Sequence, residues 1–167
     1  MLYTLLYITK PLKPYNKLEL FNFFDKLKTW NNSHNITGCL AYIEGITDNK
    51  KQCQFVHVIE GRKQELEGVL LKSKSDIRLG NTILIKGGFT TQRKFDDWTM
   101  GIERIELLDN QFIKQFFSMN YQLLAEDGDI NTNILMQFMD SFSKDRHIFR
   151  FNSLEQYNDL QEASIVA

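Results

Sequence analysis

Four side chains spread along the first half of the chain have the chemistry of a polar binding site: Tyr7, Asn31, His57 and Arg78. A carboxamide donates and accepts hydrogen bonds at once, and an imidazole can bridge two groups. A guanidinium carries several donors suited to carbonyl or phosphate oxygens. A buried phenol requires a hydrogen-bond partner. Brought together by a fold, these groups could supply the polar contacts of a binding site.

Each of these residues also has a purely structural interpretation. Asn31 could end a helix, because asparagine favours that place. Arg78 could be a solvated surface charge, Tyr7 a core tyrosine, and His57 an ordinary buried histidine with its hydrogen bonds satisfied. Asn32 lies next to Asn31, so the position of the polar contact stays open by one residue.

Hydrophobic periodicity predicts the elements that would position these residues. Strands are expected over 2–8, 37–43, 54–59, 82–86 and 98–105, and helices from a capping box at 16–19 to about Trp30 and over 63–72. A polar loop over 44–51 should join the second and third strands, and Gly87-Gly88 should end the fourth. This order predicts an α+β fold: a ferredoxin-like five-stranded mixed sheet with two helices on one face.

The pattern changes after the fifth strand, which predicts three parts: a domain over 1–105, a helical segment over 106–146 and an irregular tail over 147–167. Two C-terminal helices are expected in the second part, rich in large apolar side chains. Such helices either cap the sheet or form an oligomer interface. We expect a homo-oligomer that also contacts another protein.

Composition excludes several classes of function. The chain has 167 residues, 43% of them hydrophobic, and a net charge of −1, so no basic footprint for nucleic acid is present. The chain contains no run of about 18 apolar residues, so the sequence predicts no membrane-spanning helix. The N-terminus lacks a basic leader, and Cys39 and Cys53 suit free thiols, which together favour a cytoplasmic protein. Neither a metal-ligand spacing nor a catalytic motif appears, and the phosphate loop of acylphosphatases is missing, so we expect no enzyme.

Several short signatures, in order, resemble those of the BLUF family of blue-light sensors that use FAD. They are Leu6-Tyr7, Asn31, Ile36-Thr37-Gly38, Val58-Ile59-Glu60-Gly61, Asp76-Ile77-Arg78, and the run from Arg93 through Phe95 and Trp98 to Met100. The resemblance runs from Leu2 to about Ile105 and indicates a short, single-domain member with C-terminal helices.

The resemblance implies a cofactor and two overlapping sets of residues. The cofactor would be FAD, with FMN or riboflavin as alternatives. The photoactive set would be Tyr7, His57, Trp98 and Met100. The cofactor-binding set would be Tyr7, Trp30, Asn31, Asn32, His57, Asp76 and Arg78. In the family, light drives an electron and then a proton from the tyrosine to the flavin, and the amide of a neighbouring glutamine rearranges.

His57 stands where the family has that glutamine. Gln52 and Gln54 differ from it in parity, so they should face the other side of the sheet. An imidazole cannot exchange a carbonyl for an amine by rotation. We therefore expect an FAD-binding blue-light receptor, with an atypical or lost photocycle, that signals through protein contacts. The alternative is a flavin-free or light-insensitive interaction module on the same scaffold.

Overall fold

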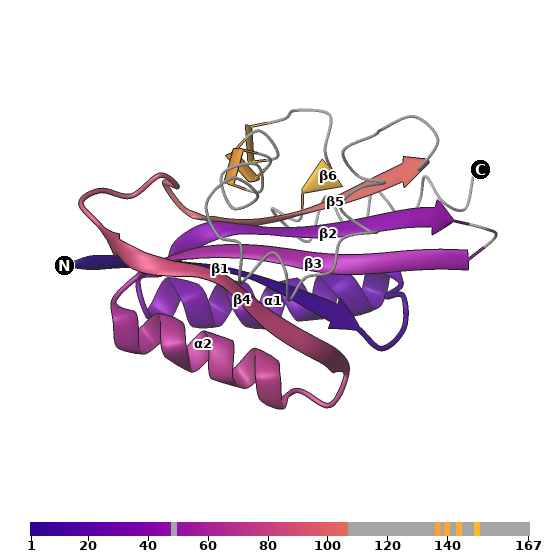
Figure 1. Cartoon of the computed structure of the whole chain (residues 1–167), viewed down its shortest axis with the longest axis horizontal. Helices are drawn as coiled ribbons and strands as arrows, with labels where there is room; N and C mark the ends of the chain where they lie inside the picture. The colour runs from indigo at the N-terminus through magenta and orange to yellow at the C-terminus, as the bar shows by residue number, and fades with distance from the viewer. Residues whose placement is uncertain (48–49, 107–135, 138, 141–142, 145–148, 151–167) are drawn as a thin grey trace.

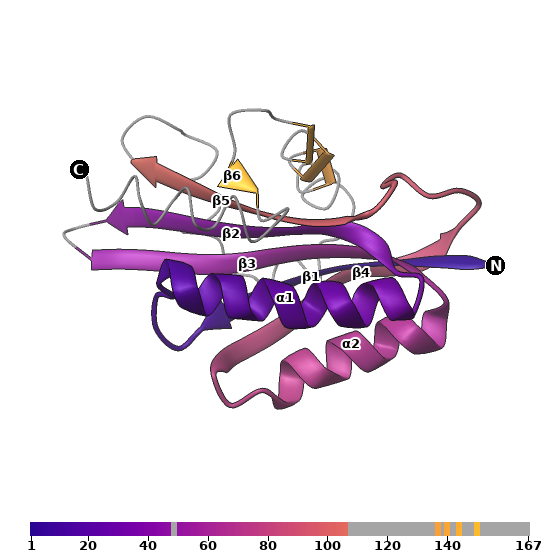
Figure 2. The same ribbon diagram turned by 180° about the vertical axis from the view of Figure 1, so that it is seen from behind.

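The computed structural model describes residues 1–47, 50–106, 136–137, 139–140, 143–144 and 149–150. Within them lie five long strands and two helices: β1 (Leu2–Pro11), α1 (Lys17–Ser33), β2 (Thr37–Thr47), β3 (Lys50–Gly61), α2 (Lys63–Ser75), β4 (Leu79–Thr90) and β5 (Trp98–Glu106). Both helices cover the same face of the sheet (Figures 1 and 2). The predicted ferredoxin-like α+β arrangement is confirmed.

The strand order is β4-β1-β3-β2-β5-β6. β1 is antiparallel to β3 and β4, and β2 is antiparallel to β3 but parallel to β5, so the sheet is mixed. β6 (Phe149–Arg150) adds two residues beside β5, within the tail expected to be irregular. The two predicted C-terminal helices lie largely outside the described residues. None of the described helices is both long and apolar enough to cross a membrane.

α1 begins as predicted and ends later than predicted. Its capping box is complete, because the Asn16 side chain accepts from the Glu19 amide and the Glu19 carboxylate accepts from the Asn16 amide. The predicted end near Trp30 was wrong, since the helix continues to Ser33 and Asn35 follows it in the left-handed conformation with φ of 54°. The amides of Asn35 and Ile36 donate to the carbonyls of Asn32 and Asn31, which is the Schellman arrangement. Asn31 is therefore not the helix cap.

Two strand boundaries also differ from the prediction. The expected loop over 44–51 is mostly strand, because the β2–β3 register continues without a break from Thr37↔Glu60 to Thr47↔Lys50. β4 continues through Gly87, where a Cβ would lie 2.9 Å from Leu5 Cδ2 and 3.0 Å from the Tyr3 hydroxyl oxygen. The glycine therefore keeps the strand going where it crosses these side chains, instead of ending it.

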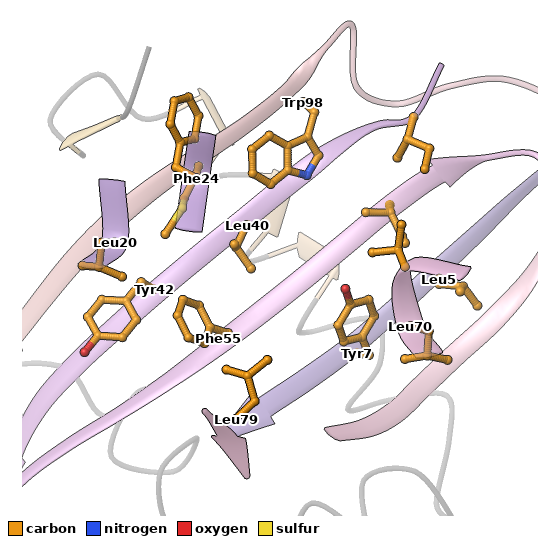
Figure 3. Packing of buried hydrophobic residues seen from close by; sticks show 14 of the residues in the cluster. Leu5, Tyr7, Leu20, Phe24, Leu40, Tyr42, Phe55, Leu70, Leu79 and Trp98 are labelled. Carbon is orange, nitrogen blue, oxygen red and sulfur yellow. The ribbon is translucent and has the colours of Figure 1, made fainter. Parts of the chain in front are cut away.

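The core between sheet and helices follows from strand alternation. Residues at every second position of each strand point at α1 and α2, and Figure 3 shows their packing: Leu5 and Tyr7 from β1, Leu40 and Tyr42 from β2, Phe55 from β3, Trp98 from β5, with Leu20 and Phe24 of α1 above them. β3 pairs with β1 and with β2 in unbroken register, so His57 shares the helix-facing side with Phe55. Gln52 and Gln54 have the opposite parity and lie on the other side, as predicted.

A buried carboxylate attaches the loop before β5 to the rest of the sheet. Glu60 is 1% exposed, and its carboxylate accepts from the backbone amides of Lys94 and Phe95 at 2.9 and 3.2 Å. Arg93 donates to the backbone oxygens of Glu60 and Asn35 and to the Thr37 hydroxyl. These bonds hold the start of β5, and with it Trp98, in position.

Replacing Glu60 by alanine should destabilise the fold by about 3 kcal/mol, because the buried amide of Phe95 and the part-buried amide of Lys94 lose their acceptor. Chemical denaturation followed by tryptophan fluorescence measures the change. Glu67→Ala serves as the control, since that side chain is 56% exposed and pairs with Lys63 on the helix surface; it should change stability by less than about 0.5 kcal/mol. Equal effects of the two substitutions would contradict the proposed attachment.

Candidate functional site

Three aromatic side chains from different strands form a continuous hydrogen-bonded chain below the helices. The Trp98 indole Nε1 donates to His57 Nε2 at 2.9 Å, and His57 Nδ1 lies 2.5 Å from the Tyr7 hydroxyl oxygen. Tyr7 and His57 are direct cross-strand neighbours on β1 and β3. All three side chains are at most 2% exposed. The tyrosine and histidine that the sequence left fifty positions apart are thus in direct contact.

Burial governs the ionisation of this chain of residues. It lowers the pKa of His57 to about 3 and raises the pKa of the Tyr7 hydroxyl well above its ordinary value. The imidazole is therefore neutral and the phenol protonated at neutral pH. Met100, the fourth residue of the predicted photoactive set, is fully buried two positions beyond Trp98 and pairs with Leu40, the partner of His57.

The lowered pKa of His57 makes stability depend on pH. An unfolded histidine titrates near pH 6.5, so below that value the unfolded chain binds a proton that the folded chain refuses until about pH 3. Stability therefore falls as the pH falls through this window, by about 1.4 kcal/mol per unit. When the pH is lowered from about 7.5 to 4.5, the unfolding free energy of His57→Gln should fall by about 3 kcal/mol less than that of the unmodified chain, as measured in urea titrations. Equal losses of unfolding free energy in both proteins would contradict the lowered pKa of His57.

A cavity of about 220 Å³ lies between α1 and α2, and we call it the slot. Its apolar walls come from Phe23, Leu27 and Trp30 on α1 and from Val69 and Leu79 on the opposite side. Its polar groups are Lys26, Lys72, Ser73, Asp76 and Arg78. A narrow space with apolar walls and a few polar groups is typical of sites for planar ligands.

Asn31 is the most informative polar residue near the slot. It lies one helical turn beyond Leu27, on the inner face of α1, and is fully buried. Neither the oxygen nor the nitrogen of its side-chain carboxamide has a hydrogen-bond partner in the part of the chain that the structure describes. Such an unpaired group costs about 1–3 kcal/mol, so it calls for a partner that both accepts and donates. The neighbouring Asn32 is exposed, so Asn31 is the better candidate for the buried polar contact.

Asp76 and Arg78 lie at one end of the slot and bind each other. The Arg78 side chain donates to both oxygens of Asp76, at 3.0 and 2.7 Å. These hydrogen bonds lower the pKa of Asp76, so both groups are charged. Arg78 and Lys26 also line a second, larger cavity of about 650 Å³, here called the outer cleft, which continues past Lys13, Tyr15 and Asn22. Cations at the junction of the two cavities suit a ligand with phosphates.

Comparison with known families settles which kind of ligand is relevant. A family model described as "Sensors of blue-light using FAD" matches residues 2–101, which is more than half of the chain. The chain belongs to the BLUF family. BLUF domains bind a flavin, whose ring has both a carbonyl and an imide N–H at its polar edge. The unpaired carboxamide of Asn31 fits that edge, because it offers a donor and an acceptor together.

Solved structures show the same fold. The ground state of BlsA superposes with a TM-score of 0.62 at 16% identity, covering 96% of this BLUF chain and 99% of BlsA. The dark state of BlrB, a BLUF protein, gives 0.56 at 20% identity, covering 84% and 96%. A bacterial light-regulated adenylyl cyclase gives 0.52 at 23% identity, and the chain spans only 36% of that protein. No curated protein matches the chain.

Placed in this BLUF fold, the predicted site residues form two neighbouring groups. Tyr7, His57, Trp98 and Met100 lie on the sheet, and Trp30, Asp76 and Arg78 line the slot above it. Among the described residues, no group of side chains could hold a metal ion.

Ser73 connects the two groups of the BLUF site, and the sequence analysis missed it. Its hydroxyl lies 3.4 Å from the Tyr7 hydroxyl, and the residue lines the slot. The signal was present, because Ser73 continues the α2 stripe of Leu66, Val69 and Leu70 by one more turn. It was missed because the helix was expected to end at Lys72. Lys26 and Lys72 of the slot were missed too, since lysines on helices usually face only solvent.

Proposed function

We propose that this BLUF chain holds FAD with its ring between α1 and α2 and serves as a blue-light receptor with an altered or lost photocycle. It would signal through protein contacts and have no catalytic activity of its own. The observation that carries the proposal is the buried carboxamide of Asn31, which lies one helical turn beyond Leu27 of the slot and has no partner among the described residues. The ring edge of a flavin supplies what this group lacks.

Each part of the slot has a role in this proposal. Leu27 and Val69 provide apolar walls for the ring, and Trp30 provides an aromatic surface beside it. Trp30 now stacks on His34, with ring centroids 3.8 Å apart, and the Lys72 ammonium lies over the Trp30 ring. Tyr7 lies under Ser73, at the floor. A bound flavin would supply light absorption and an electron acceptor; the chain orients it and excludes water.

The slot must widen to admit the ring. Its volume of about 220 Å³ is below the range of about 300–1,000 Å³ that is usual for small-molecule sites. Widening would bring the ring edge to Asn31, which is now enclosed. Flavin binding should also raise the melting temperature of the chain, because the ligand binds the folded state and not the unfolded state.

FAD is preferred over FMN in this proposal, because the outer cleft adjoins the slot and shares Lys26 and Arg78 with it. The ring would occupy the slot and the adenosine diphosphate the outer cleft. Titration of the flavin-free chain with FAD, FMN and riboflavin, followed by flavin fluorescence, tests this. Lys13→Ala, which alters the outer cleft and not the slot, should weaken FAD binding several-fold and leave the affinity for riboflavin unchanged. The control Lys17→Ala should change neither, and equal affinities for all three flavins would refute the preference.

The second candidate is a flavin-free interaction module, and the small volume of the slot favours it. The absorption spectrum of the purified chain decides between the two. A blue-absorbing flavin band that remains after desalting supports the receptor, whereas a colourless chain that takes up no added flavin supports the module. Homo-oligomer formation and a cytoplasmic location stay predictions, to be measured by light scattering and by microscopy of the tagged chain.

A further inference from the structure

The hydrogen-bonded chain of Trp98, His57 and Tyr7 has a definite direction. Trp98 pairs with Gly38 of β2, a residue without a side chain, and its indole reaches His57 on the next strand. In Figure 3 the indole nitrogen of Trp98 and the hydroxyl of Tyr7 point into the space between them. His57 occupies that space and contacts both groups.

The roles of the two imidazole nitrogens follow from the chemistry of the indole. An indole N–H can only donate, so His57 Nε2, 2.9 Å away, must present a lone pair. A neutral imidazole has one hydrogen, which is then on Nδ1 and is donated to the Tyr7 oxygen. A protonated ring is disfavoured on the same grounds, because two N–H groups would then face each other. The Tyr7 hydroxyl hydrogen points elsewhere, and Ser73 on the slot wall is within 3.4 Å.

We propose that Trp98 locks His57 in the Nδ1–H tautomer, so that both ring nitrogens are used within the protein and a flavin in the slot meets the Tyr7 hydroxyl instead of residue 57. Trp98 is thus a positioning residue that acts through His57. This inference deepens the proposed flavin site and rests on it for the flavin contact alone. It explains physically why residue 57 would not switch: releasing either nitrogen leaves Trp98 or Tyr7 with an unsatisfied buried group.

Nitrogen-15 NMR of the flavin-free chain tests the tautomer directly, without light or cofactor. Long-range nitrogen–proton correlations of His57 should show a protonated Nδ1 and an unprotonated Nε2 from about pH 5 to about pH 8. In Trp98→Phe the Nε2 hydrogen should appear, in part or in full. Trp30→Phe, the other tryptophan of the chain, should leave the His57 signals unchanged. A protonated Nε2 in the unmodified chain would overturn the proposal even if Trp98→Phe failed to fold.

Addition of FAD to the same sample tests the flavin contact. The His57 nitrogens should keep their protonation pattern, while the signals of Tyr7 and Ser73 should move. A change of the His57 tautomer on binding would show that residue 57 meets the flavin, and would overturn the inference. Failure of the chain to take up FAD would instead refute the proposed function and leave the tautomer result standing.

Discussion

His57→Gln, loaded with FAD, is expected to show a light-induced red shift of the flavin absorption that the unmodified chain does not show. A glutamine carboxamide presents a carbonyl at one side and an amine at the other, so rotation or tautomerism exchanges donor for acceptor between Tyr7 and the flavin. The imidazole of His57 cannot make this exchange, and Trp98 and Tyr7 already use both of its nitrogens. Light-minus-dark difference spectra measure the effect, and the signal of the unmodified chain should be near zero.

Two further variants establish that the recovered shift comes from the side chain at position 57. His57→Leu keeps the site buried but offers no hydrogen bond, so it should bind flavin and show no shift. Tyr7→Phe, combined with His57→Gln, should abolish the recovered shift because the phenol is lost. A clear red shift in the unmodified chain would contradict the prediction, since it would show that an imidazole at this place supports the ordinary response.

Asn31→Leu should stabilise the flavin-free protein and weaken flavin binding at the same time. Leucine is close to asparagine in size, and it removes two buried polar atoms that have no partner among the described residues. The expected gain in unfolding free energy is about 1–3 kcal/mol. The loss of two hydrogen bonds to the flavin should cost about 2–3 kcal/mol, which weakens binding by roughly a hundredfold. Urea denaturation and FAD titration measure the two effects.

Asn32→Leu is the matched control for this experiment. Asn32 follows directly in the same helix and is exposed, so its replacement should leave FAD affinity unchanged and stability within about 0.5 kcal/mol. If Asn32→Leu weakened FAD binding and Asn31→Leu did not, the polar contact would lie one residue further along the chain, and α1 would have to rotate to make it. If neither variant affected FAD, the ring would lie outside the slot.

Local patterns in the sequence were sufficient for the order of elements and for the faces of the strands. The capping box at Asn16 and Glu19 depends on residues three positions apart, so the start of α1 was predictable. The alternation along β3 put His57 on the helix side and Gln54 on the other. The BLUF signatures are likewise short strings, and the match over residues 2–101 confirms the family that they indicate.

Boundaries and contacts between distant residues were decided by the tertiary structure. α1 continues past Trp30 because Asn35 and Ile36 close a Schellman motif. Asn31 therefore lies within the helix, where its buried side chain has no hydrogen-bond partner among the described residues, and the alternative that it caps the helix is excluded. Trp98 reaches His57 only because the parallel pairing of β5 with β2 brings them together, and no local pattern encodes that pairing. The sequence by itself thus determined which groups are present and which way they face. Long-range strand pairing decided which nitrogen of His57 carries the hydrogen, because a tautomer depends on the partners on both sides of the ring.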